Sequence, residues 1–237
     1  MSRKSLIILA AWSGALITAM ILDRPVAQYV QDKGWGNKRL WTADTVFWTD
    51  LLKLPGDFIV TIVLSLLLLV FHRRRFEAAG LIAGAGAMLG LNSFLKWIIG
   101  RRRPLVGIDP FNIQWFIGGI PGLLGAEKNL SFPSGHTALA FANAMALTVL
   151  MPRGRWLYFG LATVVAAERV CENAHYVSDV VAGAVTGVLA VHVVIYLYNR
   201  WAGWENERAL RIKAWGRRIG HRIDAWYPRH AKPFEQP

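Results

Sequence analysis

The chain has 237 residues, of which 54% are hydrophobic, with eleven tryptophans and a formal net charge of +12 at neutral pH. This apolar composition excludes an ordinary soluble domain and predicts an all-α polytopic membrane protein. The positive charge does not indicate nucleic-acid binding, because the cations flank apolar runs, where they suit anionic lipid headgroups. Since Cys171 is the single cysteine, an internal disulfide and a cysteine-based metal site are excluded.

Six apolar runs predict a six-helix transmembrane bundle, which forms a first domain over residues 1–198. The runs cover residues 5–22, 54–71, 79–99, 137–151, 156–167 and 177–198. The first run has no convincing small-residue cleavage site, so we expect a retained helix. Small residues crowd the third and sixth runs, which favours close packing of those two helices.

Basic residues set the expected orientation of the bundle. The N-terminal segment, two cytoplasmic turns and the tail after Asn199 hold 16 of the 27 Lys and Arg residues. Because Lys and Arg favour cytoplasmic loops, we expect both termini in the cytoplasm. Three polar clusters then share the opposite, non-cytoplasmic side of the membrane.

The first polar cluster ends the third run. Lys96 and Arg103 are seven residues apart, about two helical turns, so both can project from one face. Such cations suit a phosphate, because arginine offers a fork of hydrogen bonds and lysine a movable point charge. Basic residues beside a membrane helix are also common topological anchors, and Arg101 and Arg102 fit that simpler interpretation.

The connection over residues 101–132 is long for two adjacent helices and contains three prolines and several aromatic residues. Long connections of this kind are often functional. The aromatic residues suit the interfacial layer of a membrane. The segment is therefore expected to form a lid or lipid-entry element, or equally a loop that only anchors.

The second cluster, Pro133-Ser134-Gly135-His136, immediately precedes the fourth run. Gly135 allows an anion to approach the backbone, Ser134 offers a hydroxyl, and the first amides of the helix point outward unpaired. A capped helix start also accounts for Ser and Pro. Capping does not require the imidazole of His136, which favours a phosphate site.

The third cluster contains Arg169, His175 and Asp179. The last two are four residues apart, close enough on a helical turn for the carboxylate to hold one ring nitrogen and leave the other as a nucleophile. Arg169 can neutralise an attacked phosphate. A local ion pair at a helix entry is the simpler alternative.

The tail, residues 199–237, forms a predicted second domain with a basic amphipathic helix. Apolar residues recur there at helical spacing among Arg and Lys, which is typical of a helix on an anionic membrane surface. These residues are Ile212, Trp215, Ile219, Ile223 and Trp226. A cytoplasmic membrane anchor is favoured over an element that binds a partner protein.

Together the three clusters resemble the type 2 phosphatidic acid phosphatase (PAP2) superfamily of integral membrane lipid phosphatases. The resemblance rests on Lys96-x6-Arg103-Pro104, the second cluster, and Arg169-x5-His175-x3-Asp179, in this order. It covers residues 96–179 and the six-helix plan. One departure is Glu168, which stands where the family usually has Ser.

The resemblance implies a role for each candidate residue. His175 is expected to attack phosphorus and form a phosphohistidine, oriented by Asp179, while His136 protonates the leaving oxygen. The remaining residues are expected to stabilise the phosphoryl charge, and they are Lys96, Arg103, Ser134, Gly135 and Arg169. No metal or other cofactor is implied.

The implied function is a phosphoric ester hydrolase that acts on a phosphorylated lipid. The candidate substrates are a lipid A phosphate, a polyprenyl diphosphate, phosphatidylglycerophosphate and phosphatidic acid. Membrane lipids are the expected partners, nucleic acid is not, and the oligomeric state stays open. A lipid phosphotransferase of the same family is an alternative. A non-catalytic phospholipid carrier is another, although it gives no reason for two histidines.

Overall fold

The computed structural model describes residues 3–37, 42–72, 75–116 and 129–224. These residues form helices and loops, with one isolated bridge between Arg102 and Leu130, so the described fold is all-α. The α-helices are α1 (Arg3–Asp32), α2 (Ala43–Lys53), α3 (Phe58–Phe71), α4 (Arg75–Met88), α5 (Leu91–Ile99), α7 (Gly135–Leu150), α8 (Arg155–Cys171) and α9 (Val177–Asp224). Three short 3₁₀ helices are η2 (Leu54–Gly56), η3 (Pro104–Val106) and η5 (Pro152–Gly154).

All six predicted apolar runs fall on helices. The third run is interrupted, because α4 ends at Met88 and α5 begins at Leu91. Helix α2 was not predicted from the sequence. It begins where the Thr42 hydroxyl accepts a hydrogen bond from the Thr45 amide at 3.3 Å, a typical N-cap.

Two of the described helical stretches, Glu77–Ile99 and Val177–Trp201, are long and apolar enough to cross a membrane. Ala43–Gly56 and Phe58–Phe71 are bent by 51° at a short break and would count as a third span if taken together. Helix α7 is apolar but shorter. Large apolar side chains on α3 and α8 are exposed, as on a surface that faces lipid. That six helices cross the membrane stays a prediction.

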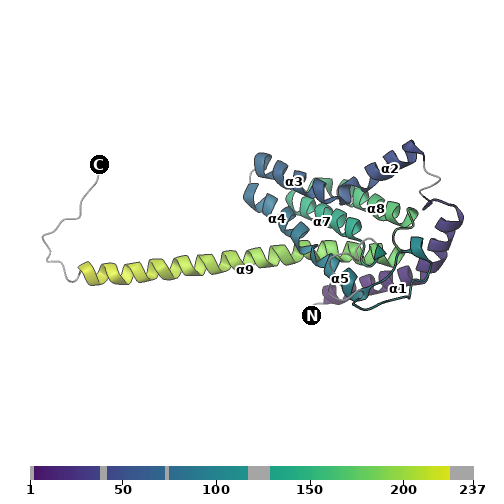
Figure 1. The fold of residues 1–237 in the computed structure, drawn as a ribbon. Coiled ribbons are helices and arrows are strands. Elements are labelled where there is room, and N and C mark those ends of the chain that lie inside the picture. Colours follow the sequence, from purple (N-terminus) through teal and green to yellow (C-terminus); the bar gives the residue numbers. More distant parts are fainter. Residues whose placement is uncertain (1–2, 38–41, 73–74, 117–128, 225–237) are drawn as a thin grey trace. The chain divides into compact units, whose positions relative to one another are not determined.

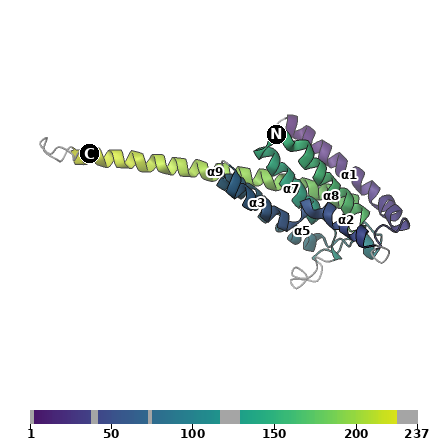
Figure 2. The same cartoon turned by 90° about the horizontal axis from the view of Figure 1, so that it is seen from above.

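Helix α7 is the central packing element, with α8 on one side and α4 on the other (Figure 1), and the view from above also shows α8 beside α7 (Figure 2). Two glycines of α9 let its backbone touch α7. A Cβ at Gly187 would lie 2.1 Å from the Ala138 carbonyl oxygen, and one at Gly183 would lie 2.6 Å from the Ser134 carbonyl oxygen. The third and sixth runs also meet, since Gly84 lies against Val194.

A methyl group at this contact is expected to separate α7 from α9. Gly187→Ala should lower the free energy of unfolding by about 1–3 kcal/mol, because the neighbouring atoms are backbone and have to shift. Gly160→Ala in α8 is the matched control, since a Cβ there meets nothing within 4 Å. The control should raise stability by about 0.4–1 kcal/mol. Thermal unfolding in detergent measures both, and equal shifts would contradict the close contact.

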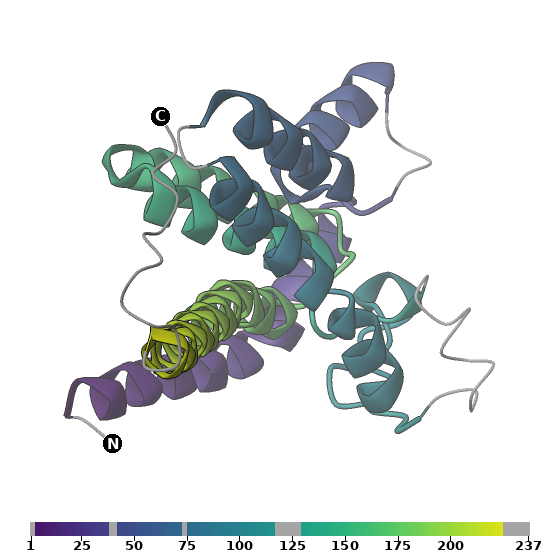
Figure 3. The same cartoon turned by 90° about the vertical axis from the view of Figure 1, so that its left-hand side faces the viewer.

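By its internal contacts the chain divides into two units, residues 1–194 and 195–237. In the first unit, α1 lies beside the first turns of α9 (Figure 3). In the second, α9 continues to Asp224. Side chains after Trp201 lie outside the description, so the amphipathic face of the tail stays a prediction. Residues 117–128 of the 101–132 connection also lie outside it, so the expected lid or anchoring loop stays a prediction.

Candidate active site

The end of α8 determines where His175 lies. Asn173 adopts the left-handed conformation, with φ of 54°, which asparagine accepts more readily than most residues. Its amide donates to the Val170 carbonyl at 2.9 Å, and the Ala174 amide donates to the Arg169 carbonyl at 3.2 Å. These bonds form a Schellman motif, which ends α8 and turns the chain toward His175.

The start of α9 is fixed by two carboxylates. Asp179 Oδ2 accepts a hydrogen bond from the Tyr176 amide at 2.8 Å, so the third residue of the helix reaches back to its cap. Asp23 of α1 caps the same helix from 155 positions away, because its Oδ1 accepts the Ser178 amide at 2.8 Å. Asp23 and Asp179 are fully buried, and both are negative charges near the positive end of a helix dipole.

His175 is buried beside Asp179, with 3.6 Å between its Nδ1 and Asp179 Oδ2. This separation is too long for a hydrogen bond, although it directs Nδ1 to the carboxylate and leaves Nε2 on the other side. Burial lowers the pKa of His175 to about 4, and the nearby positive charges of Lys96 and Arg103 act in the same direction, while Asp179 opposes them. At neutral pH the imidazole is therefore neutral, which is the form that can act as a nucleophile.

The second cluster meets the third through the backbone. The Ser134 amide donates to the Asp179 carbonyl at 3.0 Å, which joins the starts of α7 and α9. Burial lowers the pKa of His136, in the first turn of α7, to about 4, and the positive charge of Arg169 acts in the same direction. Ser134 is fully buried, and its hydroxyl is 2.9 Å from that of Thr137.

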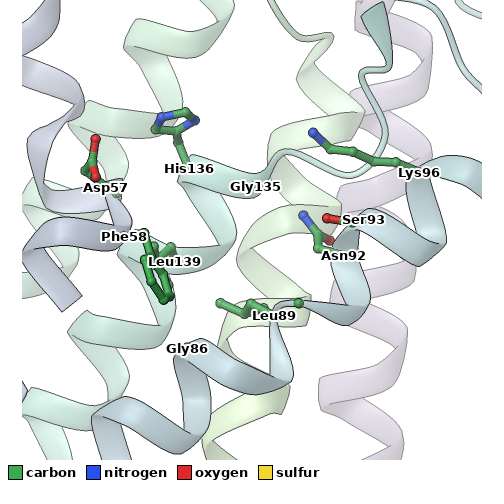
Figure 4. Close-up of a pocket in the computed structure, with 12 residues that line it drawn as sticks. Asp57, Phe58, Gly86, Leu89, Asn92, Ser93, Lys96, Gly135, His136 and Leu139 are labelled. Carbon is green, nitrogen blue, oxygen red and sulfur yellow. The ribbon is translucent and has the colours of Figure 1, made fainter. Parts of the chain in front are cut away.

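A cavity of about 380 Å³ lies beside His136 and Gly135. Figure 4 shows Lys96 extending from α5 toward Gly135, with Asn92 one turn before it, and Asp57 on the side of His136. The rest of the wall includes the apolar side chains of Phe58, Leu139 and Leu89, which Figure 4 draws below His136 and Lys96. The cavity is therefore polar at one end and apolar at the other.

Arg101, which the sequence suggested to be a topological anchor, is buried in the centre of the site. Its Nη1 lies 2.5 Å from Asp179 Oδ1, and its Nη2 lies 2.6 Å from Asp23 Oδ2. It also donates to the Ser178 hydroxyl at 2.7 Å and stacks over the Tyr176 ring at 4.3 Å. The anchor interpretation is therefore wrong for Arg101, whereas its neighbour Arg102 is exposed.

Arg103 and Arg169 form a second group of charges near His175. Burial lowers the pKa of Arg103, as does the positive charge of Arg169, and the negative charges of Glu172 and Asp179 raise it. Arg169 is buried and ion-paired with Glu168 and Glu172. The site therefore combines cations with a comparable number of carboxylates.

All eight candidate residues lie in the described part of the chain, around the ends of α5 and α8 and the starts of α7 and α9. The candidate residues that line the cavity are Lys96, Gly135 and His136. Sequence reasoning missed Asp23, Asp57 and Glu172. Asp23 had one available signal, since a carboxylate at the end of an apolar run needs a partner. Among the described residues, no group of three or more His, Cys, Asp and Glu could hold a metal ion.

Comparison with known proteins matches the part of the chain that holds the candidate site. The family model described as the PAP2 superfamily matches residues 76–202, which include all eight candidate residues. Over 97 residues the chain is 37% identical to the lipid A 1-phosphatase of Rhizobium johnstonii, covering 41% of this chain and 38% of that protein. Over 134 residues it is 27% identical to the undecaprenyl-diphosphatase of Sulfolobus acidocaldarius, covering 56% and 60%. The matched stretches span less than two thirds of either relative.

Among solved structures, the fold is similar to the crystal structure of Aquifex aeolicus LpxE. The TM-score is 0.53 at 18% sequence identity, covering 74% of this chain and 95% of that one. At this identity the likeness concerns the fold alone.

Proposed function

The chain belongs to the PAP2 superfamily, and from this membership we propose that it is a membrane-embedded lipid phosphatase that releases phosphate through a phosphohistidine at His175. The observation that carries the proposal is the joining of the second and third clusters, through the bond from the Ser134 amide to the Asp179 carbonyl. This bond holds His136 and His175 at one end of the bundle, together with cations from α5 and α8.

In the first step, the neutral His175 attacks phosphorus with the lone pair of Nε2. A P–N bond forms, the P–O bond to the lipid breaks, and His136 gives a proton to the leaving oxygen. His136 takes up this proton when the negatively charged phosphate binds beside it and raises its pKa from about 4. Asp179, facing Nδ1, stabilises the imidazole as it becomes positive. Water then attacks phosphorus and gives a proton to the now neutral His136. The P–N bond breaks, which restores neutral His175 and releases inorganic phosphate.

The phosphate oxygens are bound by Lys96, Arg103 and Arg169, with the Gly135 amide at the outward-facing start of α7. Ser134 assists from the cap position after its hydroxyl turns from Thr137. The apolar end of the cavity suits the hydrocarbon of a lipid, since ligand sites of a few hundred Å³ commonly combine an apolar wall with a few polar groups.

The relatives support a phosphorylated membrane lipid as the substrate. A lipid A phosphate and a polyprenyl diphosphate correspond to the activities for which two of the relatives are named. Phosphatidylglycerophosphate and phosphatidic acid are further candidates. We place the protein in the bacterial inner membrane with six spans, both termini in the cytoplasm, the basic tail on the cytoplasmic surface and the active site on the periplasmic side.

A phosphate-release assay tests the proposed function. The purified protein is presented in detergent micelles with each of the four lipid classes, without added metal, and released phosphate and remaining lipid are quantified. We expect release from at least one class, with the matching dephosphorylated lipid detected by mass spectrometry. Binding of these lipids without any release would contradict the proposal and favour a carrier.

A further inference from the structure

Arg169 is held in an unusual way for a cation that is expected to bind phosphate. Its Nε lies 2.5 Å from Glu168 Oε2, and its Nη2 donates to Glu168 Oε1 at 2.6 Å. Its Nη2 also lies 2.5 Å from Glu172 Oε2. All three side chains are buried, so water screens these charges little.

The two bonds to Glu168 occupy one whole edge of the guanidinium, the edge formed by Nε and Nη2. A phosphate binds arginine most strongly when two of its oxygens meet two parallel N–H groups. Both glutamates contact Arg169 at Nε and Nη2. In this arrangement a phosphate oxygen can approach Arg169 at Nη1, but a phosphate cannot form two parallel bonds along the edge that Glu168 occupies. The trio of Arg169 and two glutamates carries a net charge of −1, which disfavours an incoming dianion.

We propose that Glu168 is a positioning residue that limits the phosphate affinity of the site by holding Arg169 in a carboxylate fork. This inference rests on the proposed function and deepens it. To grip a phosphate with two bonds, Arg169 has to exchange Glu168 for the phosphate oxygens. The exchange weakens binding of the lipid phosphate, and it also prevents tight retention of the inorganic phosphate that hydrolysis leaves in the site.

The sequence is consistent with this role for Glu168. It stands immediately before Arg169, where the resemblance to the PAP2 superfamily leads us to expect Ser. A serine hydroxyl carries no charge and offers one oxygen, so it cannot close the Nε and Nη2 edge as a carboxylate does.

Glu168→Gln tests the proposal, with Glu172→Gln as the matched control. Both substitutions remove one negative charge from the same buried trio. Glu168 accepts two hydrogen bonds from Arg169 along one edge of the guanidinium, whereas Glu172 meets Arg169 through one oxygen at Nη2. Inorganic phosphate is the probe, in calorimetric titration of the purified full chain and as a competitive inhibitor of lipid hydrolysis. We expect phosphate to bind roughly tenfold more tightly to Glu168→Gln, as one charged hydrogen bond is gained, and at most about threefold more tightly to Glu172→Gln.

Glu168→Ser tests the same point if the glutamine variant is not recovered folded. Unchanged or weaker phosphate binding in the Glu168 variant would overturn the inference, because removal of a carboxylate that competes with phosphate for Arg169 should strengthen phosphate binding. Equal gains in the Glu168 and Glu172 variants would also overturn it, since charge alone would then explain both. The two proposals fail separately. Without any lipid hydrolysis by the unaltered protein the proposed function fails, while the calorimetric comparison still decides the role of Glu168.

Discussion

His175→Ala is expected to lower lipid phosphate release by at least about a thousandfold, because the variant has no group to form the covalent intermediate. The loss should appear in kcat, while phosphate and lipid still bind, since the cations that we propose to bind phosphate are unchanged. Phosphate release at saturating lipid, together with calorimetric phosphate binding, measures both quantities.

His192→Ala is the control for this experiment. His192 is exposed on α9, and its ring lies 2.9 Å from the Val188 carbonyl of the same helix. The His192→Ala variant should therefore retain full activity. A His175→Ala protein that still turns over lipid within about tenfold of the unaltered protein would remove His175 from the nucleophile role.

Arg101→Met is expected to lower the free energy of unfolding by about 3–5 kcal/mol, because it leaves two buried carboxylates without their cation. Asp23 and Asp179 are both fully buried, and both lie within 2.6 Å of the Arg101 guanidinium. Activity should fall as well, since Arg101 holds the carboxylate that faces His175. Denaturant unfolding in detergent gives the stability change.

Arg102→Met is the matched control, since this neighbouring arginine is exposed and its contact with Gln114 is long, at 3.5 Å. Its effect should stay within about 0.5 kcal/mol. Adding Asp23→Asn to Arg101→Met should recover part of the lost stability, because it removes one of the uncompensated charges. Equal effects at both arginines, or no recovery in the double variant, would contradict the buried ion pairs.

Much of the fold follows from the sequence because hydrophobic patterning is local. Each predicted apolar run falls on a helix, and the starts of α3 and α7 coincide with polar residues that suit a helix cap. Helix α2 escaped prediction because it contains polar residues throughout, and no residue in it is buried. The break between α4 and α5 was also missed, since small and apolar residues continue across it.

The site was predictable where its chemistry is local and unpredictable where tertiary contacts decide. The spacing of His175 and Asp179 indicates a pair on one helical turn, and the structure brings their side chains to 3.6 Å. Arg101 and Arg102 look alike in the sequence, and packing against Asp23, far away in the chain, buries only the first of them. The partners of Arg169 are close to it in the sequence, since Glu168 is the adjacent residue and Glu172 lies about one helical turn later. Their ion pairs with Arg169 could therefore have been predicted from spacing alone.

Trapping of the covalent intermediate tests the proposed chemistry most directly. The protein is mixed with the lipid that supports phosphate release, quenched in base within the first turnover, and digested for mass spectrometry. We predict a phosphoryl group on His175 that is lost in acid, and none in His175→Ala. Turnover of the lipid with a phosphoryl group on another residue, or without any phosphorylated protein, would contradict the account.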